Sequence, residues 1–115
     1  MNVITKEFKI KAKGLKFPEG PIYMNDGSII LVEIARGTLS KINSNGEIEV
    51  IANLGGGPNG AAIGPDGLCY VCNNGGFEWD ISDDGKFMRP VLESKSYSGG
   101  KIQKVDIMTG EFSTL

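Results

Sequence analysis

Few residue types in this chain of 115 residues could carry out chemistry, because it contains no histidine. A Ser-His-Asp triad therefore lacks its usual base. The remaining candidates are a carboxylate in Pro18-Glu19-Gly20, an amide in Pro58-Asn59-Gly60 and the pair Asn73-Asn74. A carboxylate is the group that a hard cation such as Ca²⁺ needs. Both tripeptides are also ordinary turn sequences, so residue type alone leaves a solvent-exposed turn open for Glu19 and Asn59.

Three other motifs resemble known sites but lack what those sites need. Cys69 and Cys72 form a C-x-x-C, yet no histidine or second cysteine pair completes a zinc site, and on a strand the two sulfurs point to opposite faces. Residues 55–60 fit G-x-G-x-x-G, but the next residues cannot form the helix that a dinucleotide site requires. Residues 80–85 begin like an EF-hand loop whose twelfth position, Val91, is not Glu.

Charge and hydropathy argue against some partners and cellular locations. Lys and Arg number 12 against 14 Asp and Glu, for a net charge of −2, which disfavours nucleic acid as a partner. No stretch resembles a signal peptide or approaches the roughly 18 apolar residues of a membrane span, so we expect a cytoplasmic protein without a membrane partner.

Short apolar runs closed by Gly, Asn or Asp predict strands joined by tight turns. The clearest are residues 28–32, 38–42 and 47–51, and Asp-Gly and Asn-Gly pairs between such runs are hairpin signals. The 17 glycines fit frequent turns. We therefore expect an all-β chain.

An internal repeat indicates the type of all-β fold. Pro18-Glu19-Gly20 recurs 40 residues later as Pro58-Asn59-Gly60, and the following Asp26-Gly27 recurs as Asp66-Gly67. The third strand of the first unit recurs near Gln103 at an offset of about 63, which places an insertion at about 73–100. A repeat of about 40–45 residues with four short strands is the period of a propeller blade.

These signals predict a single partial β-propeller domain over residues 1–115 with about two blades. A first strand is expected at 5–13, with Phe8, Ile10 and Ala12 facing the core because apolar residues alternate with charged ones. Blade one is expected at about 14–54 and blade two at about 55–115, including the insertion.

Residues 14–23 and 57–77 resemble the opening motifs of the SMP-30/gluconolactonase family of six-bladed β-propellers. The resemblance implies a hydrolase that opens a lactone ring at one divalent cation, most often Ca²⁺, with Zn²⁺, Mg²⁺ or Mn²⁺ as alternatives. By position, the first metal ligand falls on Glu19. The remaining Asn and Asp ligands, including the catalytic Asp, would lie beyond Leu115, so the resemblance assigns no catalytic residue here and implies that the 115-residue chain alone is inactive.

The resemblance also places Asn59 against the lactone substrate. The arginine that the family often has two residues earlier is here Gly57, which favours a smaller or more apolar lactone. Asn73 and Asn74 could line the channel mouth and bind substrate, or they could bond their own backbone. Phe77 and Trp79 could cap a pocket or pack between blades.

Two rival functions remain open at this stage. One is a non-catalytic propeller fragment that binds a protein or small ligand, since propellers host many functions. The other is a strictosidine-synthase-like or paraoxonase-like propeller enzyme. In either case two blades leave open sheet edges, through which the chain could self-associate.

Overall fold

The chain is all-β in the computed structural model, which describes residues 6–115, and no helix occurs among these residues. Consequently, nothing in this range forms a helix long and apolar enough to cross a membrane. The ten strands are β1 (Pro18–Tyr23), β2 (Ile29–Glu33), β3 (Thr38–Ile42), β4 (Ile48–Asn53), β5 (Pro58–Ile63), β6 (Cys69–Asn73), β7 (Phe77–Ile81), β8 (Met88–Glu93), β9 (Lys101–Val105) and β10 (Phe112–Thr114).

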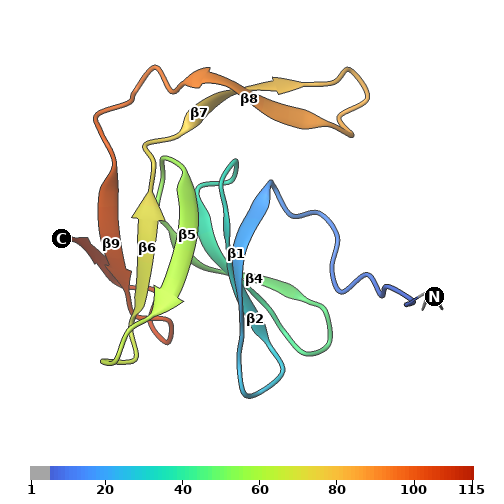
Figure 1. The fold of residues 1–115 in the computed structure, drawn as a ribbon, viewed down its shortest axis with the longest axis vertical. Coiled ribbons are helices and arrows are strands. Elements are labelled where there is room, and N and C mark those ends of the chain that lie inside the picture. The colour runs from blue at the N-terminus through green and yellow to red at the C-terminus, as the bar shows by residue number, and fades with distance from the viewer. Residues whose placement is uncertain (1–5) are drawn as a thin grey trace, which may run out of the picture.

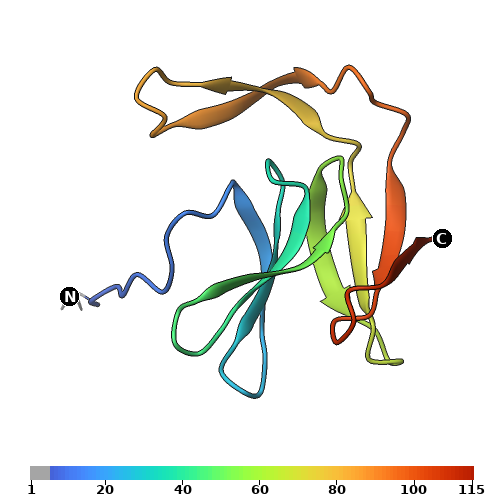
Figure 2. The same cartoon turned by 180° about the vertical axis from the view of Figure 1, so that it is seen from behind.

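The strands form three antiparallel sheets, none of which closes on itself. The first sheet has the order β1-β2-β3-β4, the second β10-β9-β6-β5, and the third is the hairpin β7-β8. Figures 1 and 2 show the two four-stranded sheets beside each other, with the hairpin lying across one of their ends. At that end β1 and β5 begin while β2 and β6 finish.

Strand boundaries repeat with the spacing read from the sequence. Adding 40 to the bounds of β1 and β2 gives those of β5 and β6, and adding 63 to those of β3 gives β9. The hairpin β7-β8 occupies the range of the expected insertion. Strands were predicted at 28–32, 38–42 and 47–51, and these predictions are confirmed to within one or two residues.

The hydrophobic core lies between the two four-stranded sheets. Side chains alternate across a strand, so each sheet contributes every second residue to it. Its buried members are Ile30, Val32, Leu39, Ala52 and Leu54 from the first sheet and its last loop, and Cys69, Val71 and Val105 from the second. Cys69 is buried and Cys72 is exposed, which confirms that the two free thiols lie on opposite faces.

The strand expected at 5–13 is absent from the described part of that range, which begins at residue 6. Phe8 and Ile10, predicted to face the core, are 96% and 74% exposed, so that prediction was wrong. A strand needs a neighbour for its N–H and C=O groups, and none of the strands in residues 18–114 pairs with this segment. Side-chain contacts hold it instead, including a bond of 2.7 Å from Lys11 Nζ to the carbonyl of Ser44.

Candidate functional site

Glu19 and Asn59 occupy equivalent positions on the first strands of the two four-stranded sheets. Each is the second residue of its strand, and both are exposed. β1 and β5 approach closely at the next residue, because a Cβ atom on Gly20 would lie 3.3 Å from Gly60 Cα and 3.3 Å from Ala61 N. The fold therefore brings the predicted metal ligand and the predicted substrate contact onto neighbouring strands.

Both strands are irregular at these residues. The pairing of β1 with β2 shifts register between Glu19 and Ile22, and that of β5 with β6 shifts between Pro58 and Gly60. Bulges of this kind re-aim side chains and are frequent beside active sites. The Glu19 carboxylate forms no hydrogen bond or ion pair with another side chain in residues 6–115, so its oxygens are available to a ligand.

Glu19 and Asn59 supply only part of the coordination that a divalent cation needs. Glu19 supplies one carboxylate and Asn59 one amide oxygen, whereas Ca²⁺ takes six to eight oxygens. In the described range no three Asp, Glu, Cys or His side chains gather as metal ligands do. The described residues thus offer part of a hard-cation site and do not form a complete one.

The Asn73 side chain is buried and hydrogen-bonded within the fold. It is 3% exposed, its Oδ1 accepts bonds from the backbone N–H groups of Gly57 and Gly75, and its Nδ2 donates to Gly55 O and Gln103 Oε1, all within 2.9–3.0 Å. These four bonds use the hydrogen-bonding capacity of the amide. Of the two readings left open by the sequence, these contacts match bonding to the chain's own backbone.

Asn74 is half-buried beside the glycine loop. Its Oδ1 accepts a bond of 2.9 Å from the N–H of Gly76. A Cβ atom on Gly57 would overlap Asn74 Oδ1 and lie 3.0 Å from Gly76 Cα, so a side chain there would require the Asn74 side chain and the Gly76 backbone to move. The surroundings of Gly57 therefore leave little space for the arginine that the family often has there.

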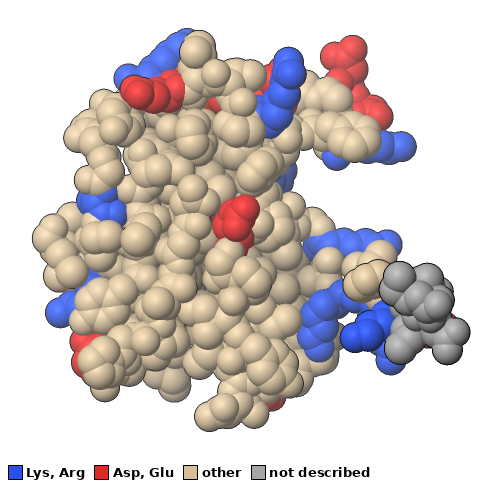
Figure 3. All heavy atoms as spheres, viewed as in Figure 1, with Lys and Arg blue, Asp and Glu red and all other residues tan. Residues whose placement is uncertain are grey.

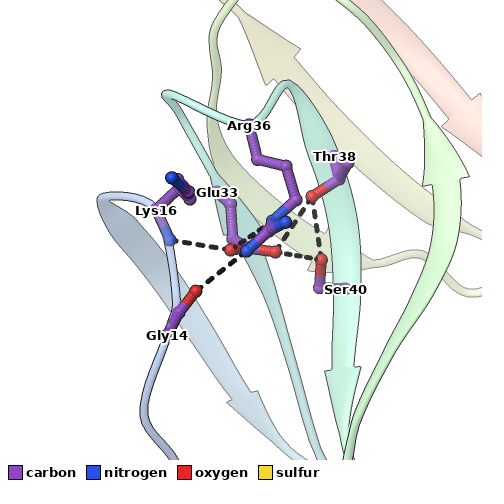
Figure 4. Close-up of polar contacts among 6 residues, drawn as sticks. All are labelled: Gly14, Lys16, Glu33, Arg36, Thr38 and Ser40. Carbon is purple, nitrogen blue, oxygen red and sulfur yellow. Dashed lines mark hydrogen bonds and ion pairs between the residues drawn. The ribbon is translucent and has the colours of Figure 1, made fainter.

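Glu33 is a buried acidic residue that the sequence analysis did not single out. It is the last residue of β2 and lies at the end of the first sheet where β1 begins. Glu33 is fully buried, and Figure 4 shows its carboxylate surrounded by donors. Oε1 accepts from Lys16 N and Arg36 Nε at 2.8 Å, while Oε2 accepts from Thr38 Oγ1 at 3.1 Å and Ser40 Oγ at 2.5 Å. Burial raises the pKa of Glu33, but the hydrogen bonds outweigh burial and leave this pKa below its ordinary value.

The hairpin β7-β8 lies across the strand ends that carry Glu19 and Asn59. At its base Gly76 packs on Gly56, where a Cβ would lie 3.1 Å from the Gly56 carbonyl carbon. Further along β7, the Trp79 ring lies 5.1 Å from the ring of Phe17, just before β1. Figure 3 shows the hairpin overhanging a hollow on the side of the N-terminal segment, where residues 14–17 and 85–88 line a cavity of about 240 Å³.

Comparison of the chain with known proteins found no matching family model and no significantly similar curated protein. The resemblance to SMP-30/gluconolactonase proteins therefore rests on the two motifs at residues 14–23 and 57–77. The signal that could have located Glu33 was the repeat itself, since Glu33 plus 40 is Asn73.

Proposed function

We propose that this chain forms two adjacent blades of a β-propeller that hydrolyses lactones with the help of a divalent cation. The observation that carries the proposal is the placement of Glu19 and Asn59 at equivalent, irregular positions on two neighbouring first strands. Two four-stranded antiparallel sheets with repeating strand boundaries support the propeller part, and the strand order of the second sheet is interrupted only by the inserted hairpin β7-β8.

In this proposal Glu19 is one ligand of the cation, with Ca²⁺ as the best match for a carboxylate oxygen. When bound, the cation would polarise the lactone carbonyl as a Lewis acid. Asn59 would hold the substrate by hydrogen bonds from its amide. Glycine at position 57 supports a small or apolar lactone, because the chain has no arginine there to clamp a polar substrate.

The proposal extends to self-association, because both outer edges of the sheets are open. The outer edge of the second sheet is the three-residue strand β10, which is exposed along its length. Ile102 and Phe112 of this sheet, and Leu115 directly after it, are 39%, 45% and 71% exposed. Contact with further blades, from another copy of the chain or another polypeptide, would cover this surface.

The test is lactone ring opening by the purified chain, with and without Ca²⁺ or Zn²⁺, at several concentrations with the mass in solution recorded. The assay would use both a sugar lactone and an alkyl lactone. Cation-dependent turnover that falls at least about 100-fold in Glu19→Gln supports the proposal. Glu49→Gln, an exposed change on β4, is the matched control and should leave turnover unchanged.

Turnover without a cation, or turnover insensitive to Glu19→Gln, would contradict the role given to Glu19. A folded chain without turnover at any concentration would contradict hydrolase activity for the 115-residue chain. That result would agree both with blades that need the other ligands from further blades and with the non-catalytic propeller segment.

A further inference from the structure

A second pocket lies between the two four-stranded sheets, at the end opposite the hairpin. Figures 1 and 2 both place the turn between β1 and β2 and the turn between β9 and β10 at that end. The pocket has a volume of about 300 Å³. It is lined by Met24, Asn25, Asp26, Ser28, Ile30, Lys41, Ile51, Ile107 and Met108. Its size is at the lower limit of ordinary small-molecule sites.

The floor and walls of this pocket are apolar. Ile30 belongs to the buried core, and Ile51, Ile107 and Met24 pack against that core while remaining partly open. Met108 is 89% exposed, the least buried of the pocket's large apolar side chains. Methionine adapts its shape to irregular ligands, and covering such a side chain removes apolar surface from water.

Two polar groups of opposite charge face the same pocket. Asp26 uses Oδ1 to accept bonds from the N–H and hydroxyl of Ser28. The ammonium of Lys41 forms no hydrogen bond or ion pair within residues 6–115. One carboxylate and one ammonium give the lining no net charge, so a ligand carrying a full charge of either sign would meet one like charge.

We propose that this pocket binds a neutral small molecule with an apolar ring or short chain and a polar group that both donates and accepts a hydrogen bond, such as an amide. The amide N–H would donate a hydrogen bond to Asp26, the carbonyl would accept one from the ammonium of Lys41, and the apolar part would cover Met24 and Met108. The pocket shares no residue with the candidate site at Glu19, and the proposal does not rest on lactone hydrolysis.

Methyl NMR of the methionines in the full chain tests this proposal. Met24 and Met108 line the pocket, whereas Met88 lies on the hairpin β7-β8. Benzamide is the probe, and benzoate and protonated benzylamine are its charged isosteres. We expect benzamide to shift the Met24 and Met108 signals saturably without moving Met88, and both charged isosteres to bind at least about fivefold more weakly.

Variants separate binding in this pocket from nonspecific association. Met108→Ala should weaken benzamide at least about threefold and, being exposed, should not unfold the chain. Lys41→Met should weaken benzamide by a similar factor and remove the discrimination against benzylamine. Met88→Ala is the control and should not change the affinity. Unsaturable shifts, equal shifts of the Met24, Met88 and Met108 signals, or an unchanged affinity in Met108→Ala would overturn the site. Equal binding of benzoate would overturn the ligand class.

Discussion

Glu33 and Asn73 occupy the same position in the two four-stranded sheets and make equivalent contacts. Each is the buried last residue of the second strand of its sheet. Each accepts a backbone N–H just before the first strand, from Lys16 and Gly57 respectively. Each also bonds a side chain of the third strand, Ser40 for Glu33 and Gln103 for Asn73, and these two partners are themselves 63 residues apart, as are β3 and β9. A carboxylate and an amide thus tie the first and third strands together at the end where Glu19 and Asn59 lie.

Because Glu33 is a carboxylate, its buried hydrogen bonds should make the free energy of unfolding depend on pH in the acidic range. Because the pKa of Glu33 in the fold is below its ordinary value of 4.5, the stabilisation is complete above that value and is lost as the pH falls through the lower folded pKa. Glu33→Gln should lower the free energy of unfolding at neutral pH by about 2 kcal/mol and flatten its decline below pH 4.5. Urea denaturation across this range measures both effects. Glu49→Gln on exposed β4 should change neither, and an equal acid response in Glu33→Gln would contradict the prediction.

The buried hydrogen bonds of Asn73 predict that alanine at position 73 lowers the free energy of unfolding more than alanine at the adjacent Asn74. Asn73→Ala would remove the side-chain partner of the Gly57 and Gly75 N–H groups and of Gln103 Oε1, and it should cost about 2–4 kcal/mol of unfolding free energy. Asn74→Ala removes one bond from a half-buried side chain and should cost about 1 kcal/mol or less. Chemical denaturation of the two variants makes the comparison. Equal losses would show that the buried network contributes less than its contacts indicate.

The contact between β1 and β5 predicts that alanine will destabilise the fold at Gly20 but not at the equivalent Gly60. Gly20 has φ +55°, and a Cβ atom on it would lie 3.3 Å from the β5 backbone, so Gly20→Ala should destabilise the fold by about 1–2 kcal/mol. Gly60 is the same residue of the next sheet, but a Cβ there would meet nothing within 4 Å. Gly60→Ala should therefore be neutral or slightly stabilising. Melting temperatures of both variants test this, and a larger loss in Gly60→Ala would contradict the strand packing.

The two cysteines should react at very different rates. Cys72 is exposed, whereas Cys69 is fully buried, and burial raises the pKa of the Cys69 thiol to about 11. Only a thiolate reacts readily with a disulfide reagent, so one thiol should react in the native chain and the second only after denaturation. Cys72→Ser should abolish the fast reaction. Two fast thiols in the native chain would mean that β6 opens readily.

Much of the strand layout could be predicted from sequence, because alternation and turn residues are local signals. The 40-residue repeat of Pro18-Glu19-Gly20 located four of the strands, and Asp-Gly and Asn-Gly pairs marked their turns. The prediction failed at residues 6–13, where Phe8 and Ile10 alternate with lysines as in a strand but remain in solvent. Alternation reports which face a strand would bury, whereas strand formation also requires a hydrogen-bonding neighbour.

The sequence by itself determined the all-β character, the repeating strand boundaries and the opposite faces of Cys69 and Cys72, since each depends on neighbouring residues along the chain. Only the tertiary structure decided that Glu19 and Asn59 lie on touching strands and that Glu33 is buried among four donors. It also decided that the Asn73 amide makes all its hydrogen bonds inside the fold. Those outcomes depend on contacts between different strands and loops, most of them 16 or more residues apart, where packing and hydrogen-bond satisfaction decide and residue type alone does not.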